Sequence, residues 1–260
     1  MDSDPPEIPV LPIPFEHGLP RFLQSITKGP ATIVAIGSST TAGEGNIPPY
    51  PGRLVSFLRD QYPTVGIIMI NKGVSGQEAP AELQRFDTDV IANNPDLVIW
   101  QVGTNAIWQP ADQHPPTFDQ TTEAIRDGLA KLRDKTRADV ILMDLQYLPA
   151  VLTPGKKNKA LAMVEAISEL ARDTGVVNVF RRFEFMKSLY QIEQVSFDRM
   201  VDPGDDANRL HQSDWATGRV AWALKLAIVG GVDKARSSAA AMASSQSAPA
   251  AAPKSVPKSL

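Results

Sequence analysis

The 260-residue sequence contains no cysteine and only three histidines. The absence of cysteine excludes disulfide bonds, a thiolate nucleophile and thiolate metal ligands. No segment approaches the roughly 18 consecutive apolar residues of a membrane-spanning helix. The net charge of -3 gives no reason to expect a nucleic acid or a membrane surface as a partner.

The first residues also lack the basic start and the apolar run of a signal peptide, because residues 1–6 are acidic and rich in proline. The sequence as given therefore predicts a cytoplasmic protein. A secreted or periplasmic chain from which a signal peptide had been removed would look the same.

Composition divides the chain into three parts. Residues 1–20 hold six prolines and predict an extended arm, while residues 21–232 alternate apolar and polar segments as a folded domain does. Residues 237–260 consist almost entirely of Ala, Ser, Pro and Lys. Such a tail cannot bury enough apolar surface to offset its ordering entropy, so we expect it to be disordered.

Five short apolar runs alternate with longer segments of helical periodicity in the folded part. The runs are residues 33–36, 65–70, 97–102, 138–145 and 176–180, and the main helical segments are residues 50–62, 79–93, 117–136, 156–174 and 213–228. This alternation predicts an α/β fold with a five-stranded parallel sheet that helices cover on both faces. The carboxyl ends of the strands then lie along one edge.

Small or amide-bearing residues follow three consecutive strands at this edge. They are Ser38-Ser39, Asn71-Lys72-Gly73 and Gly103-Thr104-Asn105. Ligand sites of open α/β sheets are built at this position. The first loop alone permits three interpretations: it binds a phosphate, presents a serine nucleophile, or forms a tight turn.

A nucleophilic serine requires a base, a group that orients the base, and donors for the oxyanion. The backbone N–H groups of Ser39 and Gly73 and the side-chain amide of Asn105 are candidate donors. His211 is the best-placed base because it immediately precedes the last helix, whereas His17 and His114 lie in proline-rich segments.

Four short blocks occur in order along the chain: Gly37-Ser38-Ser39-Thr40-Thr41, Asn71-Lys72-Gly73-Val74-Ser75-Gly76, Gly103-Thr104-Asn105 and Leu210-His211-Gln212-Ser213-Asp214-Trp215. Together they resemble the blocks of the SGNH (GDSL-type) serine hydrolases. The resemblance implies a flavodoxin-like three-layer α/β/α sandwich over residues 21–232, and ester hydrolysis without a metal or cofactor. It also implies that Ser39 is the nucleophile and His211 the base, with Ser39, Gly73 and Asn105 forming the oxyanion hole.

The sequence departs from the pattern of this family at two positions. Ser38 stands where many members have Asp, in a supporting position. Asn208 stands where the family has the Asp that orients the histidine. An amide can hold the imidazole but cannot stabilise the imidazolium with a full charge. Asp205, Asp206 or a main-chain carbonyl are the alternatives for this role.

The predicted function is therefore hydrolysis of a carboxylic ester with a short acyl group or of an acetylated carbohydrate. The sequence indicates no protein partner. Two alternatives stay open: a catalytically impaired relative, for which Asn208 is the reason, and a flavodoxin-like module that binds a phosphate-containing ligand in its first loop. The loop lacks the lysine of a P-loop, and the second alternative gives no role to Asn105 or His211.

Overall fold

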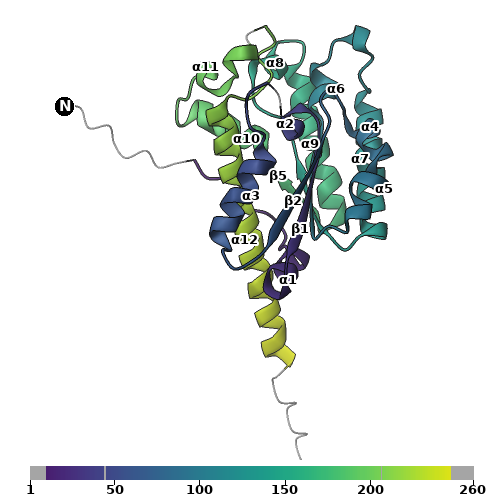
Figure 1. Ribbon diagram of the computed structural model, residues 1–260. Helices are drawn as coiled ribbons and strands as arrows, with labels where there is room; N and C mark the ends of the chain where they lie inside the picture. Colours follow the sequence, from purple (N-terminus) through teal and green to yellow (C-terminus); the bar gives the residue numbers. More distant parts are fainter. Residues whose placement is uncertain (1–9, 44, 206, 247–260) are drawn as a thin grey trace, which may run out of the picture.

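The computed structural model describes residues 10–43, 45–205 and 207–246, and a five-stranded sheet organises them (Figure 1). All neighbouring strands are parallel, and their order is β2-β1-β3-β4-β5. The strands are β1 (Ala31–Gly37), β2 (Ile67–Gly73), β3 (Leu97–Gln101), β4 (Asp139–Met143) and β5 (Asn178–Phe180). This is the order of the flavodoxin-like sheet, so the predicted fold class is confirmed.

Burial along the strands explains why the apolar runs in the sequence are continuous. Ile33, Val34, Ala35 and Ile36 of β1 are fully buried, and so is every residue of β3. A central strand that helices cover on both faces presents no side to water. The edge strand β2 differs, because several of its side chains are partly or fully exposed.

Helices form a layer on each face of the sheet (Figure 1). One layer contains α1 (Pro20–Lys28), α3 (Tyr50–Gln61), α10 (Arg182–Gln191) and α12 (Asp214–Gln246). The other contains α4 (Ala79–Gln84), α5 (Phe86–Asp89), α7 (Phe118–Lys135) and α9 (Lys157–Thr174). The remaining helices are short: α2 (Ser39–Ala42), α6 (Thr104–Trp108), α8 (Pro149–Leu152) and α11 (Phe197–Met200), with 3-10 turns at Ile91–Asn93, Ala111–Gln113 and Pro203–Asp205.

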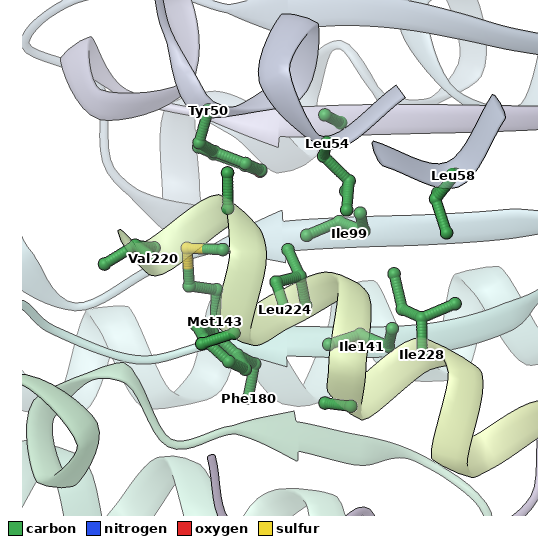
Figure 2. Close-up of a cluster of buried hydrophobic side chains, with 14 of the residues drawn as sticks. Tyr50, Leu54, Leu58, Ile99, Ile141, Met143, Phe180, Val220, Leu224 and Ile228 are labelled. Atoms are coloured by element: carbon green, nitrogen blue, oxygen red, sulfur yellow. The ribbon is translucent and has the colours of Figure 1, made fainter. Parts of the chain in front are cut away.

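Each face of the sheet has its own hydrophobic core. In the first core, side chains of α3 and α12 share one cluster with side chains of β3, β4 and β5, as Figure 2 shows. The side chains labelled there are Tyr50, Leu54, Leu58, Ile99, Ile141, Met143, Phe180, Val220, Leu224 and Ile228. Their burial fixes the orientation of α12, which begins next to His211.

The chain before α1 runs along α12 without helix or strand. Phe15 and Leu19 are buried, and the Leu19 N–H donates to the Gly231 carbonyl over 3.0 Å. A Cβ at Gly18 would lie 2.9 Å from the backbone of Ala235, so a larger residue would separate the two segments. Residues 15–19 of the predicted arm are therefore packed against the last helix.

The C-terminal prediction is wrong for residues 237–246. α12 is a 33-residue helix that continues to Gln246, although the sequence analysis ended the helix at residue 228 and expected disorder from residue 237. Alanine has the highest helix propensity, and the packed first half of α12 already provides the helix nucleus. The extension therefore forms without burying an apolar face. Residues 247–260 lie outside the described residues.

None of the helices in the described part of the chain combines the length and apolar character that crossing a membrane would require.

We predict that Gly128→Ala lowers the free energy of unfolding. A Cβ at Gly128 in α7 would lie 2.4 Å from Cη2 of Trp100, which is fully buried and packs edge-on against Phe86. Overpacking of this kind costs about 1–3 kcal/mol, which exceeds the gain of about 1 kcal/mol that alanine usually brings to a helix interior. Urea unfolding of the variant and the parent measures the difference.

The matched control is Gly230→Ala in α12, where a Cβ would have nothing within 4 Å. This variant should gain stability, by up to about 1 kcal/mol. A Gly128→Ala variant as stable as the parent would contradict the close packing of Trp100 against α7.

Candidate active site

Ser39 lies at the carboxyl end of β1, where it begins the short helix α2. The buried side chain of Gln101, the last residue of β3, holds this loop. Its Oε1 accepts hydrogen bonds from Ser38 N–H (3.1 Å), Ser38 Oγ (3.2 Å) and Thr41 Oγ1 (3.1 Å). A Cβ at Gly37 would lie 2.5 Å from Thr41 Oγ1, so only glycine allows the chain to turn this tightly here. Ser39 is thereby fixed at the edge, with its side chain directed toward His211.

His211 contacts Ser39 across 172 positions of sequence. Its Nε2 lies 3.1 Å from Ser39 Oγ, which is hydrogen-bond distance. His211 belongs to the segment between α11 and α12, which an isolated antiparallel bridge between Val201 and Gln212 holds in place, together with a 2.9 Å bond from Asp202 N–H to the His211 carbonyl. Of the three histidines, the predicted base His211 is the one that reaches Ser39. The His17 N–H instead bonds Asn178, and His114 lies in the loop before α7.

Asp205, and not Asn208, contacts the other ring nitrogen of His211. Asp205 Oδ2 lies 3.0 Å from His211 Nδ1 and accepts the backbone N–H groups of Leu210 and His211, each over 2.8 Å. Asn208 Nδ2 donates to Asp205 Oδ1 over 3.1 Å, so Asn208 binds the carboxylate oxygen that does not contact the His211 ring. Asp206, the other alternative, lies outside the described residues. The 3-10 turn at Pro203–Asp205 directs Asp205 toward the ring, which spacing along the sequence does not reveal.

Hydrogen bonding keeps the Asp205 carboxylate ionised. Partial burial acts to raise the pKa of Asp205, but the N–H groups of His211 and Leu210, the Asn208 amide and the nearby imidazole outweigh it and lower the pKa below its usual value. A charged carboxylate at Nδ1 favours the tautomer in which that nitrogen carries the proton, and Nε2 is then free to accept one.

Gly73 ends β2 directly beside α2. A Cβ at this position would lie 2.1 Å from Ala42 N, so glycine is required by the close approach of two backbones. The Gly73 N–H donates to Asn71 Oδ1 over 2.9 Å, and Asn71 Nδ2 donates to the Thr41 carbonyl over 2.6 Å. The second block therefore holds the helix that carries Ser39, and the Gly73 N–H already has an acceptor.

Asn105 lies in α6, directly after β3, and is 3 % exposed. Its Nδ2 donates one hydrogen to the Gln77 carbonyl over 2.7 Å. No acceptor for the second hydrogen of this amide is found among the described residues. The Ser39 N–H is also left without an acceptor among the described residues.

A buried polar network that the sequence analysis missed connects the third and fourth blocks. Gln146 Oε1 accepts from Thr104 Oγ1 (3.0 Å) and Arg182 Nη2 (2.9 Å), and Gln146 Nε2 donates to the Leu210 carbonyl (3.3 Å). Burial lowers the pKa of Arg182 to about 10 and raises that of Asp144, whose carbonyl Arg182 contacts, to about 7. In the sequence, this network could have been recognised only from two polar residues, Asp144 and Gln146, at the end of an apolar run.

A hollow of about 20 Å³ adjoins Ser39 and His211. Ile47, Pro49 and Thr217 contribute to its wall. A volume of roughly 10–15 Å³ on this scale holds one water molecule, so the hollow has room for a group little larger than a methyl. In the parts of the chain that the structure describes, no three His, Cys, Asp or Glu side chains gather as a metal site would require.

Comparison with known proteins gives one family and a set of related folds. The model of the non-GDSL lipase-like family matches residues 6–234. An acetylxylan esterase of Geobacillus stearothermophilus is 34 % identical over 85 residues, which are 31 % of this chain and 39 % of that relative. The aligned segment thus spans well under half the length of this curated relative.

Solved structures resemble the fold over most of the chain. The structure of Axe2, an acetylxylan esterase from Geobacillus stearothermophilus, has a TM-score of 0.62 at 22 % identity and covers 77 % of this chain and 95 % of its own. LAE5, an alpha/beta hydrolase enzyme from the metagenome of Lake Arreo, Spain, has a TM-score of 0.64 at 16 % identity, with 81 % and 99 % covered. At these identities the likeness extends to the fold alone.

The resemblance to the SGNH (GDSL-type) family found in the sequence is not supported as such, because the matching family is described as non-GDSL. This agrees with the first block, in which Ser38 precedes Ser39 where the GDSL signature has Asp. Since the match spans residues 6–234, the chain belongs to the non-GDSL lipase-like family.

Proposed function

We propose that the chain hydrolyses carboxylic esters through an acyl-enzyme on Ser39, with His211 as the general base and Asp205 as the group that orients it. One observation carries the proposal, namely the unbroken series of contacts from Ser39 Oγ to His211 Nε2 (3.1 Å) and from His211 Nδ1 to Asp205 Oδ2 (3.0 Å). A hydroxyl, an imidazole and a carboxylate in this order form the arrangement that activates serine in unrelated folds.

In the acylation step, Ser39 Oγ attacks the ester carbonyl carbon while its proton passes to His211 Nε2. The carbonyl oxygen becomes an oxyanion, which the Ser39 N–H and the remaining hydrogen of the Asn105 amide stabilise. The Gly73 N–H joins them only after releasing Asn71 Oδ1. Collapse of the tetrahedral intermediate breaks the ester C–O bond, and the alcohol leaves with the proton from His211.

In the second step, His211 removes a proton from water as the water oxygen attacks the acyl carbon. The carboxylic acid then leaves and Ser39 Oγ recovers its proton from His211. Throughout the cycle Asp205 stays ionised beside Nδ1 and stabilises the imidazolium. The low pKa of Asp205 supports this role.

Structural relatives add support to this assignment. Three structures of Axe2 are described as catalytic mutants in which a serine, an aspartate or a histidine is replaced by alanine, with the aspartate three residues before the histidine. Here that spacing falls on Asn208, and the contact with His211 is made by Asp205, six residues before it. We therefore propose an SGNH-type mechanism in which Asp205 is the carboxylate that orients the histidine. Asn208 then gives no reason to expect an impaired site.

The size of the hollow favours a short acyl group. Space for little more than a methyl beside Ser39 suits an acetyl ester. An acetylated carbohydrate is the proposed substrate class, in keeping with the activity named for the acetylxylan esterase.

Ser39→Ala should abolish turnover of p-nitrophenyl acetate, with a loss of about 10³-fold or more in kcat, because the acyl-enzyme cannot form. The parent should hydrolyse the acetate faster than the octanoate. Release of p-nitrophenol measures both, and equal melting temperatures establish that the variant is folded. Equal turnover by the parent and Ser39→Ala would end the serine-hydrolase proposal.

Asp205→Asn should lower kcat by about 10²–10⁴-fold, because an amide at this position can select the wrong tautomer of His211. Asn208→Ala, the matched control, should cost less than about tenfold, since Asn208 only donates to Asp205. Steady-state kinetics with p-nitrophenyl acetate tests both variants. If Asn208→Ala were the more damaging, Asn208 and not Asp205 would be the orienting group.

A further inference from the structure

Glu78 is a buried carboxylate that the proposed catalytic cycle does not use. It immediately precedes α4 and is 5 % exposed. Its position is unusual for a charged residue, because carboxylates are rarely buried without partners. The partners of Glu78 are all backbone N–H groups.

Four N–H groups converge on its two carboxylate oxygens. Oε1 accepts from Ala79 (3.0 Å) and Gly103 (2.7 Å), and Oε2 accepts from Asn105 (2.9 Å) and Ala106 (3.2 Å). Three of these four donors belong to the loop and first turn that contain Asn105. Glu78 therefore binds one segment through both of its oxygens.

The segment has no cap of its own. Gly103 occupies the N-cap position of α6 with φ near +90°, and it has no side chain to accept the free N–H groups of the first turn. A Cβ at Gly103 would lie 2.8 Å from Leu145 and 2.9 Å from Met163, so no capping side chain fits there. Glu78 supplies the missing acceptors from another helix.

The same loop also holds the Asn105 side chain. The Gln77 carbonyl, one residue before Glu78, accepts one hydrogen of the Asn105 amide over 2.7 Å. Residues 77 and 78 together fix both the backbone and the side chain of Asn105. The direction of its second amide hydrogen follows from these contacts.

We propose that Glu78 is a positioning residue for ester hydrolysis, which acts by holding Asn105 in place as an oxyanion donor. The inference rests on the proposed function, because it takes Asn105 to meet the oxyanion. Glu78 itself touches neither the substrate nor Ser39.

Glu82 provides an internal comparison on the same helix. It is fully buried, its Oε2 accepts from Trp100 Nε1 over 2.7 Å, and its Oε1 has no partner among the described residues. Burial raises the pKa of Glu82 well above its usual value, and the neighbouring Glu78 adds to the effect. Glu82 thus accepts from the core indole and makes no hydrogen bond to the Asn105 loop among the described residues.

Replacing Glu78 or Glu82 by glutamine distinguishes a role in positioning Asn105 from a role in the core. In Glu78→Gln the NH₂ group faces two backbone donors in either orientation, so one pair of N–H groups loses its acceptor. In Glu82→Gln the amide oxygen can take the Trp100 bond while the NH₂ occupies the place of the unpartnered oxygen. The first change should disturb Asn105, and the second should leave the site intact.

The test is a double-mutant cycle on kcat for p-nitrophenyl acetate. Asn105→Ala should lower kcat by about 10²–10³-fold. Glu78→Gln should lower it by about 10–100-fold with KM changed less than about threefold, because an oxyanion donor acts in the transition state. The double variant should fall within about threefold of Asn105→Ala alone, and Glu82→Gln within about threefold of the parent.

Losses that multiply in the double variant would overturn the proposal, since Glu78 would then act independently of Asn105. So would a Glu78→Gln variant with the kcat of the parent and only a lower melting temperature. If Glu78→Gln does not fold, Glu78→Asp replaces it in the cycle, because the shorter carboxylate cannot reach both pairs of donors. Failure of both variants to fold would assign Glu78 to stability and also overturn the proposal.

The proposed function fails by a different result. If Ser39→Ala and Asn105→Ala leave turnover unchanged, the serine mechanism itself is wrong. If both abolish turnover and Glu78→Gln does not lower it, only the role of Glu78 is wrong.

Discussion

The parallel pairing of β1 with β2 and β3 is the constraint on which the site depends. Gly37 pairs with Gly73, and Ile36 pairs with Trp100, so three strands end at one level. The loops that follow them therefore begin at the same edge of the sheet, although they are far apart in sequence. Glycine at the ends of β1 and β2 lets α2 lie against both, because a Cβ at Gly73 would meet the backbone of Ala42. The position of Ser39 is therefore a property of the sheet.

Buried and half-buried side chains between the loops provide the second level of organisation. Gln101 accepts from the Ser39 loop, Glu78 from the Asn105 loop, Gln146 from Thr104 and Arg182, and Asp205 from the His211 segment. A buried polar group without a hydrogen-bond partner costs about 1–3 kcal/mol, so breaking any of these contacts is unfavourable. These contacts therefore hold the donors and acceptors at the edge of the sheet rigidly. A site preorganised in this way needs little rearrangement during a reaction.

Local sequence patterns predicted some residues of the candidate site and not others. Ser39 and His211 were predictable because each lies at a recognisable boundary, the end of a buried strand and the start of the last helix. The third member of the triad was left open, because spacing placed Asn208 at the position of the family's Asp while Asp205 and Asp206 lay close by. Asp205 makes the contact because the 3-10 turn at Pro203–Asp205 alters the path of the chain. Glu78 carried no signal, since its four partners come from two separate segments.

Apolar periodicity and strand-ending glycines are local properties of the chain, so the α/β class, the five strands and the edge at which the polar loops meet were predictable from the amino acids alone. Packing was needed to show which carboxylate contacts His211, why Gly73 must be glycine and what holds Asn105. Each of these three features depends on distances between segments far apart in sequence. Hydrogen bonds and close backbone contacts act over a few ångströms, and only the packed sheet and helices bring those segments that close.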